Sequence, residues 1–285
     1  MSLRSTTRRI AAMDTSDGAG VKIKRSLGQS PHARLDPYLM LDEFGSDEPH
    51  DYIAGFPSHP HRGFETVTYM IEGHMLHEDH LGNRGHLKNG GVQWMTAGRG
   101  VVHSEMPQQE SGQMRGFQLW LNLPAAEKMK PAGYRDIQPD EIPELTLGDA
   151  RVKLVAGTLA VGGQTHEGAV TGGSTQPLYA DIHLAAGGEV EVPVAKGLSG
   201  LVYLYEGTAE LETDAGQEVL NRSSAHILSD GDGIRLRAGT EGARILLIAG
   251  RPIGEPIVQY GPFVMNSREE IEQTLQDFRD GRLTA

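Results

Sequence analysis

The chain has 285 residues, of which 38% are hydrophobic and 22% charged, and its formal net charge is −12. This composition is typical of a globular protein, and the length predicts two domains. A negative field of this size repels phosphate backbones and anionic lipids, which argues against direct binding to nucleic acid or to a membrane. The chain has no cysteine, which excludes disulfides, thiolate nucleophiles and cysteine-ligated metals.

No apolar run approaches the length needed to span a membrane, and the polar N-terminus lacks the apolar core of a signal peptide. The absence of cysteine also fits a reducing compartment. We therefore expect a cytoplasmic protein, and the expected form is a monomer.

From residue 38 to about 123, short apolar runs alternate with Gly, Asn, Asp and Pro, as in strands joined by tight turns. A second stretch between residues 178 and 249 shows the same alternation of apolar runs and turn residues. The expected strands are 66–71, 90–96, 116–123, 178–184, 201–206, 209–212, 226–228, 233–236 and 244–249. Residues 124–147 are rich in Pro, Lys, Asp and Glu and predict a connector with one short helical turn. We expect two domains, 1–135 and 136–285.

The two strand-rich stretches resemble each other. The run at 69–73, Tyr-Met-Ile-Glu-Gly, recurs at 203–207 as Tyr-Leu-Tyr-Glu-Gly, and the run at 98–102 recurs in similar form at 231–235. Such internal similarity predicts a duplicated unit. The sequence therefore predicts an all-β protein with two related barrels.

Only the C-terminal segment has the pattern of a helix. Asn266 or Ser267 can cap its first turn, and Ile271, Leu275 and Phe278 form an apolar stripe at helical spacing. We expect this helix to pack against a barrel.

Two short segments carry candidate metal ligands, His59-Pro60-His61 and His103-Ser104-Glu105. Residues i and i+2 of a strand point to the same face, so each segment offers two ligands side by side. Facing strands would bring the four together. Three imidazoles and one carboxylate suit Fe, Mn, Ni, Cu or Zn and leave coordination positions open for a substrate.

These segments resemble the cupin superfamily, whose first motif has His-x-His with a Glu four residues later and whose second has Gly-x-x-His. The chain is more similar to the pirin family, and the similar runs lie at residues 35–44, 59–67, 93–100 and 259–264. The resemblance implies two cupin-type β-sandwich or jelly-roll barrels in tandem with a short C-terminal helix.

The pirin resemblance places one metal ion on His59, His61, His103 and Glu105. The general cupin pattern would instead use the first-motif glutamate, here Glu65, which shares the face of His59 and His61 if no bulge intervenes. We prefer Glu105 to Glu65.

The second half of the chain lacks these ligands. Aligned on the repeated runs, it places Pro193 and Ala195 opposite the first pair and Leu236 and Ala238 opposite the second. None of these side chains can bind a metal, so we expect a C-terminal domain without one.

The remaining histidines are expected to have surface or hydrogen-bonding roles. His74, His77 and His80 are three residues apart, so His77 faces away from the other two in a strand, and all three are expected to face solvent. The large apolar side chains near the site are expected to fill the barrel. These are Trp94, Met95, Phe117 and Trp120.

The resemblance implies a metal-dependent dioxygenase of the quercetin 2,3-dioxygenase type, acting with dioxygen on quercetin or a related flavonol or aromatic enol. Its metal would be one divalent transition ion, with Fe expected and Mn, Ni, Cu, Zn or Co as alternatives. Glu105 would serve as ligand and as proton acceptor. The alternative is a metal- or redox-responsive regulator that binds a partner protein, such as a transcription coregulator or a modulator of a metabolic enzyme.

Overall fold

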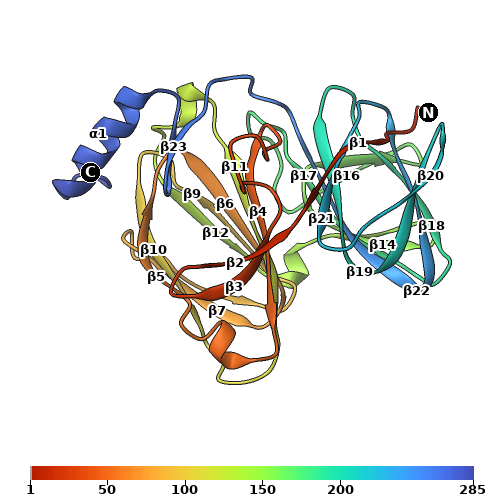
Figure 1. Ribbon diagram of the computed structural model, residues 1–285, viewed down its shortest axis with the longest axis horizontal. Helices are drawn as coiled ribbons and strands as arrows, with labels where there is room; N and C mark the ends of the chain where they lie inside the picture. Colours follow the sequence, from red (N-terminus) through yellow and green to blue (C-terminus); the bar gives the residue numbers. More distant parts are fainter. Residues whose placement is uncertain (1) are drawn as a thin grey trace. The chain divides into compact units, whose positions relative to one another are not determined.

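The computed structural model describes residues 2–285, which form β-strands, three short 3-10 turns and one α-helix (Figure 1). The chain forms two compact units. The first barrel comprises Asp14–Arg25, Tyr38–Pro139 and Ile253–Ala285, and the second comprises the described residues 2–13, Ser26–Pro37 and Asp140–Pro252. The predicted all-β class with tandem barrels and a C-terminal helix is confirmed.

The first barrel is built from two antiparallel sheets and a hairpin. The larger sheet has the order β12 (Gly133–Ile137), β9 (Val92–Thr96), β6 (Phe64–Glu72), β11 (Met114–Asn122), β4 (Tyr38–Ser46), β3 (Val21–Arg25) and β2 (Met13–Asp17). The smaller sheet has the order β5 (Phe56–His61), β10 (Val101–Pro107), β7 (His74–Asp79) and β8 (Arg84–Lys88). The hairpin pairs β23 (Val258–Tyr260) with β24 (Phe263–Met265).

The two sheets of the first barrel pack face to face. Met70 and Met114 of the larger sheet belong to one buried cluster with Met75 and Leu87 of the smaller sheet. This packing removes apolar surface from water and is the main stabilising contribution to a sandwich. It also leaves the inward face of β5, β10 and β7 enclosed.

The second barrel has one nine-stranded sheet and one small hairpin. The sheet contains β1 (Thr6–Ala11), β21 (Ser224–Leu228), β19 (Ser199–Thr213), β22 (Gly233–Gly250), β17 (Leu178–Leu184), β14 (Ala150–Ala156) and β13 (Glu144–Leu147), with β18 (Glu189–Pro193) on β22 and β20 (Gly216–Val219) on β19. The hairpin pairs β15 (Thr158–Val161) with β16 (Gln164–Glu167). Its aliphatic core includes Val192, Ile234 and Leu236, all fully buried.

Two strands of the second barrel are longer than the sequence predicts. The expected pairs of strands at 201–206 with 209–212, and at 233–236 with 244–249, are the single strands β19 and β22. Gly207 has a φ of +74°, and the register between the two strands shifts beside it. A bulge of this kind bends a strand without ending it, so the glycine does not mark a turn.

The predicted connector at 124–147 is also more ordered than expected. It contains two 3-10 turns, Ala125–Glu127 and Pro139–Glu141, together with β12 and β13. A third 3-10 turn, Pro49–Asp51, follows β4. Because β12 pairs with β9 and β13 pairs with β14, each half of the connector belongs to a different barrel.

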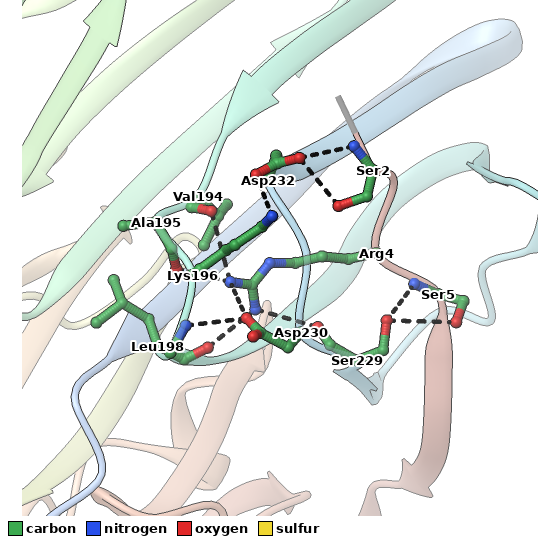
Figure 2. A network of polar contacts seen from close by, with 11 residues as sticks. Ser2, Arg4, Ser5, Val194, Ala195, Lys196, Leu198, Ser229, Asp230 and Asp232 are labelled. Carbon is green, nitrogen blue, oxygen red and sulfur yellow. Dashed lines mark hydrogen bonds and ion pairs between the residues drawn. The ribbon is translucent and has the colours of Figure 1, made fainter.

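The N-terminal segment belongs to the second barrel, whereas the sequence-based division at residue 135 assigns it to the first domain. β1 pairs with β21 in antiparallel register. The Arg4 guanidinium is fully buried and donates to the carbonyl oxygens of Ala195 (2.7 Å), Leu198 (2.9 Å) and Ser229 (3.1 Å). Figure 2 shows this network, in which backbone carbonyls from two loops converge on the guanidinium.

The C-terminal helix α1 (Arg268–Arg279) belongs to the first barrel, whereas the division at 135 places it in the second domain. Ser267 caps it, and Glu270 completes a capping box. Ile271 is buried against Phe263 of the hairpin, but Phe278, predicted on the same stripe, is 46% exposed. Among residues 2–285, no helix combines the length and hydropathy that a membrane-spanning helix requires.

Lys128 links the C-terminal hairpin to the rest of the first barrel by hydrogen bonds. Its side chain is 1% exposed, and its Nζ donates to Gly63 O (2.8 Å), Asn122 Oδ1 (2.7 Å) and Val264 O (3.0 Å). Burial lowers the pKa of Lys128 to about 8. An ammonium group has three N–H donors, and all three are used here.

We expect Lys128→Met to destabilise the first barrel by about 1–3 kcal/mol, the usual cost when buried hydrogen-bond groups lose their partner. Methionine fills similar space but leaves three buried acceptors without a donor. Both tryptophans, Trp94 and Trp120, lie in this barrel, so their fluorescence during urea unfolding reports its stability. Lys88→Met, at an exposed position on β8, is the control and should change little.

Candidate metal centre

Three histidines converge inside the first barrel from neighbouring strands. β5 and β10 pair so that His103 lies directly opposite His59, while His61 lies opposite Val101. The ring centroids are 4.3 Å apart for His59 and His103, 4.7 Å for His59 and His61, and 5.0 Å for His61 and His103. One ligand nitrogen from each ring lies within 4.8 Å of the other two.

The protonation of these rings suits metal binding. Burial lowers the pKa of His61 and of His103 well below the usual value, and the neighbouring imidazoles add to the effect. His61 Nδ1 and His103 Nε2 are buried, and neither has a hydrogen-bond partner in residues 2–285. His59 Nδ1 lies 2.8 Å from Pro57 O, which fixes its proton there and leaves the Nε2 lone pair available.

Glu105 lies next to this group but not within it. It belongs to a second group, with His77 and His103, whose ligand atoms lie within 4.8 Å of one another. Its carboxylate accepts hydrogen bonds from Thr68 Oγ1 (3.1 Å) and Gln118 Nε2 (3.3 Å), both on the opposite sheet. His103 belongs to both groups and so links the predicted pair His59 and His61 with the predicted pair His103 and Glu105.

The donor set fits a transition metal ion. Neutral imidazoles are the commonest nitrogen ligands of such ions, and buried nitrogen lone pairs without a donor are costly unless something binds them. Two such nitrogens, on His61 and His103, lie in one cluster with His59. Glu105 lies in the adjoining group, which shares His103 with this one.

The Glu65 carboxylate binds side chains outside the cluster of three histidines. Trp94 Nε1 donates to Glu65 Oε2 (3.0 Å), and Thr96 Oγ1 donates to Glu65 Oε1 (2.7 Å), which also lies 3.2 Å from Lys130 Nζ. Both carboxylate oxygens thus bind side chains of the first barrel. No metal group formed by the described residues includes Glu65.

We expect Glu65→Gln to leave the metal content of the protein unchanged, because the carboxylate already has three partners other than a metal. Elemental analysis of the purified variant beside the unaltered protein measures this. Loss of the metal in Glu65→Gln would favour the general cupin ligand set over the one proposed here.

The expectation that His77 faces solvent is wrong. Its side chain is 1% exposed, its Nδ1 lies 3.4 Å from His103 Nδ1, and its ring stacks on Tyr134 with centroids 4.3 Å apart. His74 and His80 do face the other way, as strand parity predicts. The signal that could have identified His77 is the i, i+2 pair His77-Glu78-Asp79, which has the spacing of the two ligand segments.

Aromatic side chains line the barrel as predicted. Trp94 and Phe117 are buried. Trp120 is half-buried, with its ring centroid 5.3 Å from that of His61 and 4.3 Å from that of Phe64. Trp120 and Phe64 thus place aromatic rings beside the candidate ligand His61.

The second barrel shows no such group among its described residues. Leu236 and Ala238 are buried in its aliphatic core. Pro193 is half-buried and Ala195 is exposed, whereas their neighbours Val192 and Val194 are buried in that core. The buried ones among these positions of the second barrel are therefore occupied by aliphatic packing.

Comparison with known proteins identifies the family. Residues 20–121 match the pirin family model, and residues 179–284 match the pirin C-terminal cupin domain. The chain is 55% identical over 269 residues to a Pseudomonas aeruginosa protein provisionally named quercetin 2,3-dioxygenase, covering 94% of both chains. It is 37% identical to human pirin over 284 residues, covering 99% of this chain and 94% of that one.

A solved structure shares the whole fold. The crystal structure of quercetin 2,3-dioxygenase from Acinetobacter baumannii aligns with a TM-score of 0.89 at 32% identity, covering 100% of this chain and 99% of that one. The residues that match the pirin family model, 20–121, include the runs at 59–67 and 93–100. This chain is a member of the pirin family, with the bicupin fold of its quercetin 2,3-dioxygenase relatives.

Proposed function

We propose that this protein is a metal-dependent dioxygenase that acts on quercetin or a related flavonol, with one iron ion held by His59, His61, His103 and Glu105. The observation that carries the proposal is the cluster of three imidazoles, of which His61 and His103 are buried and each have one nitrogen without a partner. The relatives named quercetin 2,3-dioxygenase support the substrate class. We further propose that it works as a cytoplasmic monomer.

A bound transition ion would supply Lewis-acid activation, lowering the pKa of a coordinated aromatic hydroxyl by stabilising its anion. The residues of the chain provide the geometry. His59 and His61 share one face of β5, and His103 lies opposite His59 on β10, so strand pairing presets the ligand positions. Trp120, beside His61, offers a flat apolar surface on which an aromatic substrate can lie.

Glu105 is the proton acceptor in this proposal. Thr68 and Gln118 hold its two oxygens by hydrogen bonds from the opposite sheet. These bonds orient the carboxylate next to His103 and keep it in the barrel interior, where it is 3% exposed. A carboxylate so placed can take the proton of a substrate hydroxyl.

We expect Glu105→Gln to lower turnover by roughly 10²–10⁴-fold at saturating metal, the usual contribution of a general base. Glutamine keeps the size and the hydrogen bond from Thr68 but cannot accept the proton. Elemental analysis and turnover are measured on the same sample. If metal content and turnover fall in equal proportion, Glu105 is a ligand only and the proton-acceptor role is wrong.

The activity is tested by oxygen consumption with quercetin, using protein purified without chelator and analysed for its metals. The proposal requires turnover that follows the content of iron or another bound metal and disappears in His61→Ala. Stoichiometric metal without turnover would instead favour the regulatory alternative, in which the metal state alters a surface recognised by a partner protein.

A further inference from the structure

A third pair of residues with the ligand spacing lies inside the first barrel. His77 and Asp79 stand on β7, next to β10, where Glu105 lies opposite His77 and His103 lies opposite Asp79. The side chains of His77 and Asp79 are each 1% exposed. They therefore share the enclosed face of the smaller sheet with the candidate ligands.

These side chains form a chain of contacts that ends at His103. His103 Nδ1 lies 3.4 Å from His77 Nδ1, and His77 Nε2 lies 3.5 Å from Asp79 Oδ2. The other nitrogen of His103, Nε2, is the buried atom without a partner. The order of atoms thus runs from the metal-facing nitrogen of His103, through His77, to the carboxylate of Asp79.

The environment of Asp79 makes it an acceptor. The backbone N–H groups of Leu81 (2.9 Å) and Asn83 (3.0 Å) donate to Asp79 Oδ1, and Asn83 Nδ2 donates to Oδ2 (2.9 Å). Three donors fix a carboxylate in place and leave it to accept from His77 Nε2–H as well.

This acceptor determines where the remaining protons lie. With the proton of His77 on Nε2, its Nδ1 carries a lone pair, and His103 Nδ1–H can donate to it. His103 is then in the tautomer whose Nε2 lone pair faces His59 and His61. A histidine that binds a metal usually donates its other N–H to such a partner, which fixes the ring and raises its basicity as a ligand.

The position of His77 is itself fixed by packing. Tyr134 of β12 stacks on it with an interplanar angle of 17°. Gly85 lies opposite His77 on β8, and a Cβ at that position would come within 1.8 Å of the Tyr134 hydroxyl oxygen. A glycine is needed here so that the tyrosine ring can lie against the histidine.

We propose that His77 and Asp79 are positioning residues for the metal ligand His103, with Asp79 setting the tautomer of His77 and His77 setting that of His103. The inference rests on the proposed metal site. It gives a role to the one buried histidine of this barrel's smaller sheet that the ligand set leaves unused among the described residues.

The test is titration of metal-free protein with Co²⁺, followed by its visible absorption and by calorimetry. His77→Leu removes the acceptor at similar size and should weaken Co²⁺ binding by roughly 10–100-fold, as loss of such a partner usually does. His77→Gln restores an acceptor oxygen and should recover part of that loss. The shape and intensity of the Co²⁺ spectrum at saturation should show an unchanged coordination number in both variants.

The control is His86→Ala, an exposed position on the neighbouring strand β8, with thermal unfolding recorded for every variant. Unchanged Co²⁺ affinity in His77→Leu, equal losses in His77→Leu and His77→Gln, or a changed coordination number would each overturn the proposal. Asp79→Asn, which keeps the size, should weaken binding less than His77→Leu. If the unaltered protein binds no Co²⁺, the metal site itself is wrong, a separate result.

Discussion

Replacing His103 with alanine is expected to weaken metal binding by more than about 100-fold. Loss of a residue that only hydrogen-bonds to a metal ligand typically lowers metal affinity by roughly 10–100-fold, and loss of the ligand itself should lower it further. His103 belongs to both ligand groups in the barrel, so its loss disrupts each of them. His59→Ala should have a comparable effect. Elemental analysis of purified protein and calorimetric titration of metal-free protein measure the change.

Stability provides a second readout of the same prediction. A metal ion at 100 times its Kd stabilises the folded state by about 2.7 kcal/mol. The unfolding temperature of the unaltered protein should therefore rise with added metal, whereas that of His103→Ala should not. His86→Ala, on the exposed face of β8, should behave as the unaltered protein does. Full metal retention in both His59→Ala and His103→Ala would refute the ligand assignment.

Gly63→Ala is expected to destabilise the first barrel by roughly 2–6 kcal/mol, the sum of backbone strain and overpacking. Gly63 has a φ of +93°, and a Cβ there would lie 2.0 Å from Val264 O of the C-terminal hairpin. Its own N–H donates to Gly98 O (2.8 Å), so the backbone has little freedom to move away.

A matched glycine separates the two contributions. Gly82 has a similar φ of +83°, but nothing lies within 4 Å of a Cβ at that position. Gly82→Ala should therefore show the conformational cost alone, about 1–3 kcal/mol. Urea unfolding followed by fluorescence of Trp94 and Trp120 compares the two variants. Equal losses would mean that contact with Val264 does not constrain the segment after His61.

The contacts of Arg62, which follows His61, explain why Gly63→Ala should also weaken binding at the proposed metal site. The buried Arg62 donates to Leu283 O (2.9 Å) and to Asp277 Oδ2 (2.8 Å), and its Nε donates to Arg99 O. Arg62, next to His61, is thus fixed by α1 and the C-terminal tail, and it binds the carbonyl oxygen of Arg99 in the turn before β10. Weaker Co²⁺ binding by Gly63→Ala than by the unaltered protein would be the corresponding result.

The sequence by itself determined the features that depend on local rules. Strand parity places His59 with His61 and His103 with Glu105 on common faces, whichever strands they pair with. The apolar runs punctuated by glycine predict an all-β chain, and Asn266 or Ser267 followed by acidic residues predicts the start of α1, where the structure shows Ser267 to be the cap. These patterns extend over a few residues, so no distant contact is needed to interpret them.

Only the tertiary structure decided which faces are enclosed and which strands are neighbours. Strand parity places His77 on the face of β7 opposite to that of His74 and His80, without saying which face is buried. Because β7 pairs with β10, His77 lies on the same inner face as His103 and Glu105. Glu65 shares parity with His61, yet Trp94 and Thr96 of β9 bind its carboxylate. Likewise, the N-terminal segment lies in the second barrel and the C-terminal segment in the first, whereas a single division at residue 135 assigns them the other way round. Such outcomes depend on pairings between residues far apart in sequence, which local patterns do not specify.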